Sequence, residues 1–365
     1  MKITELSVHN FKNYEELRLT IDSKINLFYG ANGSGKTNLL DAIYYLAISK
    51  SYFVNGDAYV MRNGSDYFRL KGTFAGGPKP IDIVIKKRVG QTKVIEYQKK
   101  KLSSASELLG KIPIVLIAPD DIKLVKQGSK DRRDFVNRIL CQSNNSYLER
   151  LLLHNRFLAQ KNALLKQTGS IDFELLDQYN NELIRHGSEL YSLRQQLIDD
   201  YKPFVIDVYN TLATDEELVD IDYISQFHDK SMNTVYRDYM SDEIRYKRLL
   251  VGLHKDDFEF VLNNRPLKKI GSQGQIKSFL YALRIGEYLY LKQKLTEKPI
   301  LMLDDYFEKL DQHRLTSLVK LIADDTFDQV FLTDTMLDRT KELLTKFGID
   351  FATYHVDKSE VTTID

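Results

Sequence analysis

Apolar residues recur along the chain at two spacings, and the change from one to the other divides the sequence into regions. Over residues 1 to about 120 they form short runs or alternate with polar residues, as in strands that bury one or both faces. The predicted strands are residues 2–8, 17–21, 24–29, 68–74, 81–86, 94–97 and 112–117. This first region is therefore predicted to be rich in β-structure.

The spacing becomes largely helical between residue 131 and about residue 251. Leucines recur there on two successive amphipathic surfaces. The first surface contains Leu148, Leu151, Leu152, Leu158, Leu164 and Leu165, and the second contains Leu175, Leu183, Leu190, Leu193 and Leu197. Two successive helices of this kind predict a short antiparallel arm.

Strand patterns return after residue 251. Residues 258–262 precede an Asn263-Asn264 turn, which predicts a hairpin. Further strands are predicted at residues 329–333, 351–356 and 361–364. The chain is therefore expected to form a head from residues 1–120 and 251–365, with a mostly helical inserted domain at residues 121–250.

A phosphate-binding loop is predicted between the apolar strand at residues 25–29 and a following helix. The segment reads Gly30-Ala31-Asn32-Gly33-Ser34-Gly35-Lys36-Thr37 and continues with Asn38. Its glycines permit backbone angles that let consecutive N–H groups surround phosphates at a helix N-terminus. Lys36 is expected to reach the β and γ phosphates, and the hydroxyl of Thr37 to bind Mg²⁺. The sequence thus predicts ATP and Mg²⁺ as cofactors.

A second motif is an apolar strand, residues 299–303, that ends in two carboxylates. Asp304 is expected to hold the magnesium shell, and Asp305 to orient or deprotonate the attacking water. An alternative interpretation is a helix N-cap, where aspartate is also favoured. The phosphate-binding loop upstream favours the catalytic interpretation.

A third motif lies between the phosphate loop and the Asp-Asp strand, shortly before the latter. It consists of Ser272, Gln273, Gly274 and Gln275, which open a predicted helix at residues 277–295. Ser272 and Gly274 could donate to an anion, although a plain helix N-cap is the alternative for such a segment taken alone. The order of phosphate loop, S-x-G-Q helix, Asp-Asp strand and then Asp311 is that of an ABC-type ATPase. The predicted fold class is α/β, an ABC-type P-loop head with a helical insertion.

Nearly end to end, the chain resembles the RecF DNA-repair ATPases, which belong to the group that includes SMC proteins. The resemblance is carried by residues 3–14, 30–46, 118–121 with Arg132-Arg133, 252–257, 272–275 and 303–311. Lys255 and Lys277 stand where the family pattern has arginine, so these positions keep the charge and lose the bidentate fork. Tyr306 replaces a small aliphatic residue.

The resemblance implies a mechanism in which ATP is held between two copies of the chain. Ser272 and Gly274 of one copy would reach the γ-phosphate held by Lys36 of the other, and Asp311 would lie near the same interface. Asp305, Lys36 and Ser272 would form the catalytic set. Slow, DNA-stimulated hydrolysis would then release the dimer and act as a switch.

The resemblance also implies the biological partners. These are double-stranded DNA, junctions of double- and single-stranded DNA, single-stranded DNA, RecR and RecO, with RecA loaded indirectly at gaps during the SOS response to DNA damage. Two alternatives come from different classes: an ABC-type ATPase subunit acting in transport or another SMC-like role, and a related nuclease, which would carry a further metal-dependent domain. A nucleotide-free DNA-binding module is disfavoured by the intact nucleotide motifs.

Composition restricts where DNA could bind. The 365 residues include 52 basic and 51 acidic side chains, a net charge of +1, so only a local patch could attract DNA. The candidate clusters are Lys86-Lys87-Arg88 with Lys93, Lys99-Lys100-Lys101, the set Lys123, Lys126, Lys130, Arg132 and Arg133, and Arg245-Lys247-Arg248. No apolar run approaches the length of about 18 residues that a membrane span needs. A cytoplasmic, nucleoid-associated protein without a membrane partner is expected.

Overall fold

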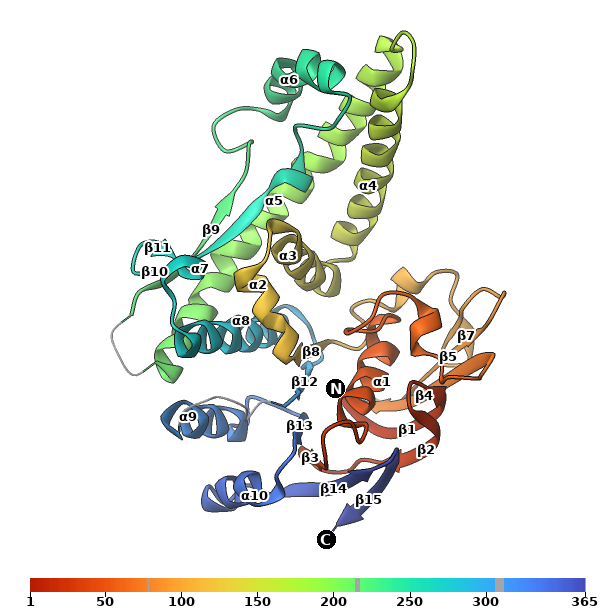
Figure 1. Cartoon of the computed structure of the whole chain (residues 1–365), viewed down its shortest axis with the longest axis vertical. Coiled ribbons are helices and arrows are strands. Elements are labelled where there is room, and N and C mark those ends of the chain that lie inside the picture. The colour runs from red at the N-terminus through yellow and green to blue at the C-terminus, as the bar shows by residue number, and fades with distance from the viewer. Residues whose placement is uncertain (78, 214–216, 306–311, 365) are drawn as a thin grey trace.

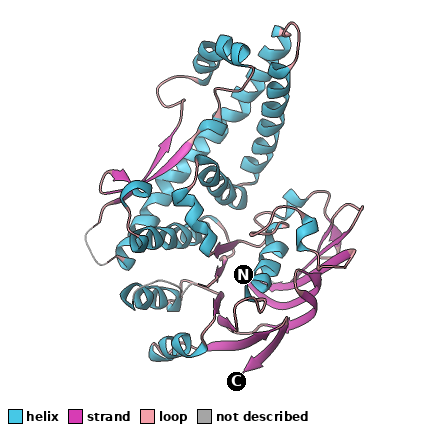
Figure 2. Cartoon of the chain, viewed as in Figure 1, coloured by secondary structure: helices cyan, strands magenta, loops and turns pink. Residues whose placement is uncertain are grey.

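The computed structural model describes residues 1–77, 79–213, 217–305 and 312–364. The molecule is elongated, and a strand-rich part lies below a helical arm (Figure 1). Coloured by secondary structure, most strands gather at the lower right, while helices make up most of the upper half and enclose a small sheet within residues 219–266 (Figure 2). This separation follows the change in apolar spacing along the sequence.

A mostly parallel sheet lies at the centre of the head, in the order β15-β14-β3-β13-β12-β8. Its strands are β3 (Ile25–Tyr29), β8 (Ile114–Ile117), β12 (Ile300–Leu303), β13 (Val330–Asp334), β14 (Phe351–Asp357) and β15 (Glu360–Ile364). Every residue of β8, β12 and β13 is buried, as expected for parallel strands covered on both faces. Because β3, β12 and β13 run in parallel, their carboxyl ends meet at one edge of this sheet.

A second, antiparallel sheet covers one face of the head, in the order β2-β1-β4-β5-β6-β7. Its strands are β1 (Lys2–Phe11), β2 (Tyr14–Thr20), β4 (Tyr67–Ala75), β5 (Ile81–Arg88), β6 (Val94–Tyr97) and β7 (Lys100–Lys101). Helix α1 (Lys36–Ile48) shares one apolar core with both sheets, so almost all of its circumference is buried. The helix that begins at Lys36 is therefore held on all sides.

Alternate residues of the parallel sheet belong to two different cores. Ile300 and Met302 of β12 face the core around α1, whereas Leu301 and Leu303 face the core that contains the remaining helices. These helices are α2 (Ile122–Lys126), α3 (Ser129–Ser143), α4 (Asn145–Lys166), α5 (Phe173–Leu212), α6 (Met232–Tyr246), α7 (Leu267–Ile270), α8 (Gln273–Lys294), α9 (Gln312–Ala323) and α10 (Leu337–Lys346). The sheet thus connects the nucleotide-loop core to the arm core.

The arm consists of α4 and α5, which lie side by side and run in opposite directions (Figure 1). Asn144 and Asp172 cap the two helices, each accepting a hydrogen bond from a backbone N–H in the first turn. Helix α5 has 40 residues and so extends for about 60 Å. The predicted pair of amphipathic helices is confirmed, with the second much longer than the first.

A small sheet, β11-β10-β9, joins the arm to the head. Its strands are β9 (Val219–Ile224), β10 (Asp257–Leu262) and β11 (Arg265–Pro266). The predicted hairpin is confirmed, since Asn263 and Asn264 adopt left-handed φ angles of 48° and 58° between β10 and β11. Strand β9 was not predicted, because it lies inside the stretch expected to be helical.

The division into a head and an inserted domain at residues 121–250 stays a prediction. Strand β9 pairs with β10 across that boundary, and α5 packs along α8. The other strands predicted near the two ends of the chain are present within a few residues of their expected bounds. Among the described residues, no helix combines the length and apolar character needed to cross a membrane.

Candidate nucleotide site

The predicted phosphate loop connects β3 to α1 and contains two positions that only glycine fits. A methyl group at Gly30 would lie 2.1 Å from the carbonyl oxygen of Val356. Gly35 has a φ of 123°, and a methyl group there would lie 2.6 Å from the side-chain nitrogen of Asn13. Gly33 also has a positive φ, of 78°. The glycines therefore allow both the turn and the close approach of neighbouring segments.

Lys36 is almost fully buried at the start of α1, with 4% of its surface exposed. Its ammonium group donates to the carbonyl oxygens of Gly30 at 2.8 Å and Ala31 at 3.0 Å. The side chain thus folds back over its own loop, which fixes the ammonium where a phosphate held by the loop would meet it. An ammonium has three donors, so one remains beyond these two bonds.

Two hairpin turns brace the loop from either side, and the sequence did not reveal them. Tyr14 donates its hydroxyl hydrogen to the carbonyl oxygen of Gly35 at 3.1 Å. Asn13 donates to the hydroxyl of Ser359 at 2.8 Å and accepts from Asn38 at 2.7 Å. The β1–β2 turn and the β14–β15 turn therefore set the shape of the loop before any ligand binds.

The two carboxylates at the end of β12 lie beside the loop, as predicted. Both oxygens of Asp304 lie 3.0 Å from the hydroxyl oxygen of Thr37, and Oδ1 also accepts from the hydroxyl of Thr333 at 2.9 Å. The backbone N–H of Asp305 donates to the same Thr333 hydroxyl at 2.7 Å. Asp305 has a φ of 43°, in the left-handed region. The loop helix, β12 and β13 thus meet at one point.

Burial dominates the electrostatics of Asp304. Loss of solvent, together with the neighbouring charge of Asp305, raises the pKa of Asp304 to about 6, although the hydroxyls of Thr333 and Thr37 and the charge of Lys36 oppose the shift. A carboxylate in this position is poorly solvated when ionised. Among the described residues it has no ion-pair partner within hydrogen-bonding distance, so a cation would relieve its charge.

The donor set fits magnesium. Asp304 supplies carboxylate oxygens and Thr37 a hydroxyl oxygen, the hard ligands that Mg²⁺ takes in small number alongside water and phosphate oxygens. Asp305 follows directly and lines the same cavity. The arrangement can therefore hold a metal–triphosphate beside a carboxylate able to orient water.

The S-x-G-Q segment forms the N-terminus of α8. The hydroxyl of Ser272 accepts from the N–H of Gln275 at 3.2 Å, and the Gln275 side chain accepts from the N–H of Ser272 at 2.7 Å. This is a capping box, so the helix-cap interpretation of the segment is correct within one chain. Ser272 and Gln273 remain exposed to solvent, and no hydrogen bond joins Ser272 to residues 30–37 within the described part of the chain.

A cavity of about 320 Å³ separates α8 from the carboxylates. Gln273, Ile276 and Lys277 of α8 line it together with Asp304 and Asp305. The structure thus brings residues of the second and third motifs to one cavity, while Ser272 is exposed to solvent. Asp311 and Tyr306, which the sequence analysis also singled out, lie outside the described residues.

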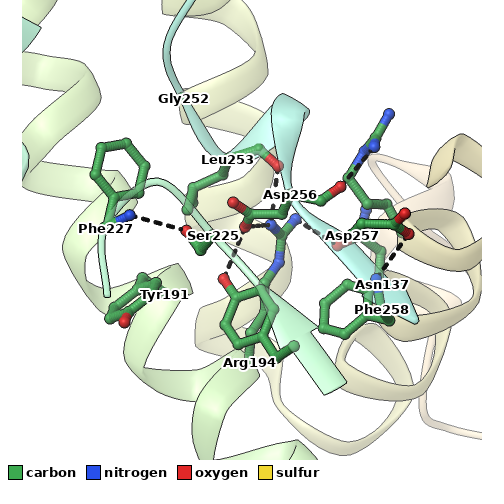
Figure 3. Close-up of polar contacts among 12 residues, drawn as sticks. Asn137, Tyr191, Arg194, Ser225, Phe227, Gly252, Leu253, Asp256, Asp257 and Phe258 are labelled. Carbon is green, nitrogen blue, oxygen red and sulfur yellow. Dashed lines mark hydrogen bonds and ion pairs between the residues drawn. The ribbon is translucent and has the colours of Figure 1, made fainter. Parts of the chain in front are cut away.

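Two of the segments that carry the family resemblance, Arg132-Arg133 and residues 252–257, contact each other. Arg132 forms a bidentate pair with Asp257, at 2.7 and 3.0 Å. Arg194 of α5 donates to Asp256 at 2.7 Å and to the carbonyl oxygen of Leu253 at 3.1 Å, and Figure 3 shows Arg194 enclosed among these groups. These charges tie α3 and the arm to β10, so their role is structural.

A similar buried ion pair joins Arg284 of α8 to Asp121. Arg284 donates to both carboxylate oxygens of Asp121, at 3.0 and 2.6 Å, and to Glu287 at 2.8 Å. Tyr52, which follows α1, donates its hydroxyl hydrogen to the same Asp121. The segment after the loop helix is therefore joined to the S-x-G-Q helix through a shared carboxylate.

The candidate DNA clusters differ in how far their charges are neutralised. Lys86 pairs with Glu96 at 2.9 Å and Arg88 with Asp66 at 3.6 Å. The other engaged side chains are Lys93 with Asp57, Lys123 with Asp120, Arg132 with Asp257, and Arg133 with the carbonyl oxygen of Asp256. Lys99-Lys100-Lys101 and Arg245-Lys247-Arg248 are exposed and lack an acidic partner among the described residues. Lys126 and Lys130 are also exposed.

Comparison with known proteins agrees with this geometry. A family model described as an AAA ATPase domain matches residues 1–267. The chain is 36% identical to the DNA replication and repair protein RecF of Cytophaga hutchinsonii over 364 residues, covering 99% of this chain and 96% of that protein. It is 35% identical to the protein of the same name from Flavobacterium johnsoniae over 347 residues, covering 94% and 97%.

Solved structures show the same fold. The recombination mediator protein RecF with ATP, in the RecFOR pathway, matches with a TM-score of 0.88 and 24% identity, covering 100% of this chain and 97% of that chain. An Smc head bound to the C-winged helix domain of ScpA matches with a TM-score of 0.57 and 12% identity, covering 100% and 97%. The predicted fold class, an ABC-type ATPase head with a helical insertion, is confirmed.

Proposed function

The chain belongs to the RecF family, and from this premise we propose that it is an ATP-switched DNA-binding protein of replication and repair. The observation that carries the proposal is the convergence of Lys36, Thr37 and Asp304 at one edge of the parallel sheet. Two segments far apart in sequence meet there: the loop supplies a phosphate cradle and the Thr37 hydroxyl, and the end of β12 supplies a carboxylate. ATP is the proposed ligand.

Each nucleotide-site residue has a proposed role. The backbone of residues 30–35 surrounds the β and γ phosphates, Lys36 contacts them directly, and Asn38 continues the loop helix. Thr37 and Asp304 hold Mg²⁺, which supplies charge neutralisation on the triphosphate. Asp305 orients or deprotonates the attacking water. Lys36→Met is expected to lose nucleotide affinity in a titration, and unchanged binding would remove Lys36 from the site.

ATP is proposed to join two copies of the chain. Ser272, Gln273, Gly274 and Gln275 are the segment offered to the partner's nucleotide, which the exposure of Ser272 and Gln273 supports. The γ-phosphate then completes a contact that one chain does not make alone, so ATP favours the dimer and hydrolysis releases it. Asp311 is proposed to lie near this interface. The dimer acts as a clamp on DNA, with slow, DNA-stimulated hydrolysis resetting it.

DNA is proposed to contact the two exposed clusters that lack acidic partners, Lys99-Lys100-Lys101 and Arg245-Lys247-Arg248. Binding through such side chains is mainly to phosphates, hence salt-dependent and indifferent to sequence. Reversing either cluster to glutamate is expected to weaken DNA binding and flatten its salt dependence. Lys86-Lys87-Arg88 is the matched control, because its members already have polar partners.

The family supplies the proposed setting. The substrates are double-stranded DNA, double- and single-stranded junctions, and single-stranded gaps. RecR and RecO are the proposed partners, with RecA loading as the indirect outcome in the response to DNA damage. These assignments rest on family membership, and the fluorescence anisotropy of labelled junction DNA with and without RecR would test them directly.

Sedimentation with and without ATP and Mg²⁺ tests the clamp. The parent protein is expected to sediment as a dimer only with ATP, and Ser272→Arg to remain a monomer that still binds ATP. Ser231→Arg is the matched control, because Ser231 is also an exposed serine that caps a helix but lies at the start of α6 in the arm. An ATP-bound monomeric parent, or a Ser272→Arg protein that dimerises normally, would contradict the proposal.

A further inference from the structure

The hydroxyl of Thr333, at the carboxyl end of β13, contacts the carboxylate of Asp304 and the backbone of Asp305. Thr333 is completely buried. Its hydroxyl donates to Oδ1 of Asp304 at 2.9 Å and accepts from the backbone N–H of Asp305 at 2.7 Å. A hydroxyl has one hydrogen to donate, so that hydrogen is committed to Asp304. One atom therefore contacts both members of the pair.

The chain at this point is held from both neighbouring strands. The N–H of Asp304 donates to the carbonyl oxygen of Ile117 in β8 at 2.8 Å, while the N–H of Asp305 is held by Thr333 of β13. Between them the backbone turns, because Asp305 adopts a left-handed φ of 43° that residues with a side chain rarely take. Thr333 thus anchors the N–H of the residue at which the backbone leaves strand geometry.

The residue type is informative. Position 333 is a buried strand position, where valine would have the same branched shape and no polar atom to satisfy. A threonine there loses the hydration of its hydroxyl on folding, and the two hydrogen bonds offset that loss of free energy. The two groups that this hydroxyl satisfies belong to Asp304 and Asp305.

We propose that Thr333 is a positioning residue for ATP hydrolysis, which fixes the carboxylate of Asp304 relative to the backbone that carries Asp305. Its hydroxyl is fully buried and acts through these two residues. The inference rests on the proposed function, because it assigns Asp304 and Asp305 those roles. Loss of the hydroxyl would leave the Asp304 side chain held, among the described residues, by Thr37 alone and would release the backbone N–H of Asp305.

The test compares Thr333→Val, Thr333→Ala and Thr333→Ser with Thr340→Val. Thr340 is an equally buried threonine seven positions away, whose hydroxyl donates to Asp334 at 2.5 Å and contacts neither site carboxylate. Thermal unfolding first shows which variants are folded. Nucleotide titration in EDTA, single-turnover ATP hydrolysis, and Mn²⁺ binding to the nucleotide complex by electron paramagnetic resonance are then measured.

Thr333→Val and Thr333→Ala are expected to hydrolyse ATP about ten- to a hundredfold more slowly, as displaced catalytic groups do. Mn²⁺ binding to their nucleotide complexes should weaken about tenfold, the lower end of losses seen when groups supporting metal ligands are removed. Nucleotide affinity in EDTA should stay within about twofold. Thr333→Ser should recover most of both losses, and Thr340→Val should resemble the parent in both measurements.

Three results would overturn the inference: parental hydrolysis and Mn²⁺ binding in the hydroxyl-free variants, a serine variant as impaired as valine, or equal losses in Thr340→Val. Loss of nucleotide affinity in EDTA would also overturn it, because Thr333 would then support the loop as a whole. Mn²⁺ binding does not depend on turnover. It decides the inference even if the parent protein hydrolyses no ATP, a result that would count against the proposed function instead.

Discussion

The dipeptide Asp-Asp at the end of β12 and the dipeptide Asp-Asp that opens β10 have the same sequence and opposite surroundings. Asp256 and Asp257 each meet an arginine, Arg194 and Arg132, at 2.7 Å. Asp304 instead meets the hydroxyls of Thr37 and Thr333. Asp256 and Asp257 lie at the amino end of a strand in the small antiparallel sheet, whereas Asp304 and Asp305 follow the carboxyl end of a strand in the central sheet.

The two pairs differ in the source of the positive charge that compensates the carboxylate, which is either an arginine of the same chain or, at the proposed nucleotide site, a bound cation. A buried carboxylate that is paired with arginine is complete within the chain and ties elements together. One that receives only neutral hydroxyl donors keeps its charge uncompensated, which is the condition that draws in a cation and marks functional sites. Arg284 and Asp121 under α8 follow the first pattern. The comparison therefore separates structural carboxylates from reactive ones without reference to relatives.

The largest contrast is expected in hydrolysis. Asp305→Asn should slow ATP turnover by about a hundred- to ten-thousandfold while ATP still binds, since a positioned base contributes that much. Asp257→Asn, the matched change in the other pair, should leave turnover of the folded protein near the parental rate. Single-turnover hydrolysis and a nucleotide titration on both variants decide the point. Parental turnover in Asp305→Asn would remove this residue as the base.

Stability should show the next largest contrast. Arg194→Leu leaves Asp256 buried without its cation and is expected to lower the free energy of unfolding by about 3–5 kcal/mol. Arg18→Leu is the control, because Arg18 and Glu16 form an exposed pair worth little. Urea denaturation measures both. A loss in Arg194→Leu no larger than in the control would mean that the arm does not depend on this pair.

The sign of the stability change should reverse at the nucleotide site. Asp304→Asn removes a poorly solvated charge, so the nucleotide-free protein should become more stable by about 1–2 kcal/mol. The same variant should lose the effect of Mg²⁺ on nucleotide affinity. Asp256→Asn, by contrast, should be destabilised, because Arg194 loses its counter-charge. Thermal unfolding of the two asparagine variants compares them directly. A destabilised Asp304→Asn protein would contradict the difference between the uncompensated Asp304 and the arginine-paired Asp256.

The smallest effect concerns pH. Burial alone would raise the pKa of Asp257, but the hydrogen bonds and charge of Arg132 bring it below its usual value. A lowered folded-state pKa adds stability that is present above the ordinary value near 4 and is lost as the pH falls through the folded one. Asp257→Asn should therefore cost less than about 1 kcal/mol at pH 7, and the deficit should shrink by about pH 3. A deficit independent of pH would exclude the ion pair as its cause.

Much of the fold was predictable because its signals are local. The phosphate loop, the strands beside it and the Asp-Asp strand each carry their pattern within a few residues. Strand β9 was not predicted, because its alternation of Asp220 and Asp222 with apolar residues extends over only six positions and lies between long helical stretches. The strand alternation was present in the sequence, but the neighbouring segments predicted helix.

The parts of the site that the sequence did not reveal depend on contacts between distant segments. In the sequence, Thr333 is one residue of an apolar strand, and nothing near it indicates that it contacts Asp304 and the backbone of Asp305. Asn13 and Ser359 brace the phosphate loop from positions 346 residues apart. Their roles become visible only when the sheet order places the two turns side by side.

That sheet order also sets when the site can form during synthesis. Strand β3 leaves the ribosome early, yet its two neighbours are β13 and β14, whose residues Val330 and Phe351 both pair with Ile25. A chain stalled before β13 carries the whole phosphate-loop motif but neither strand that flanks it. The sheet that holds the phosphate loop can therefore be completed only when nearly the whole chain has been synthesised.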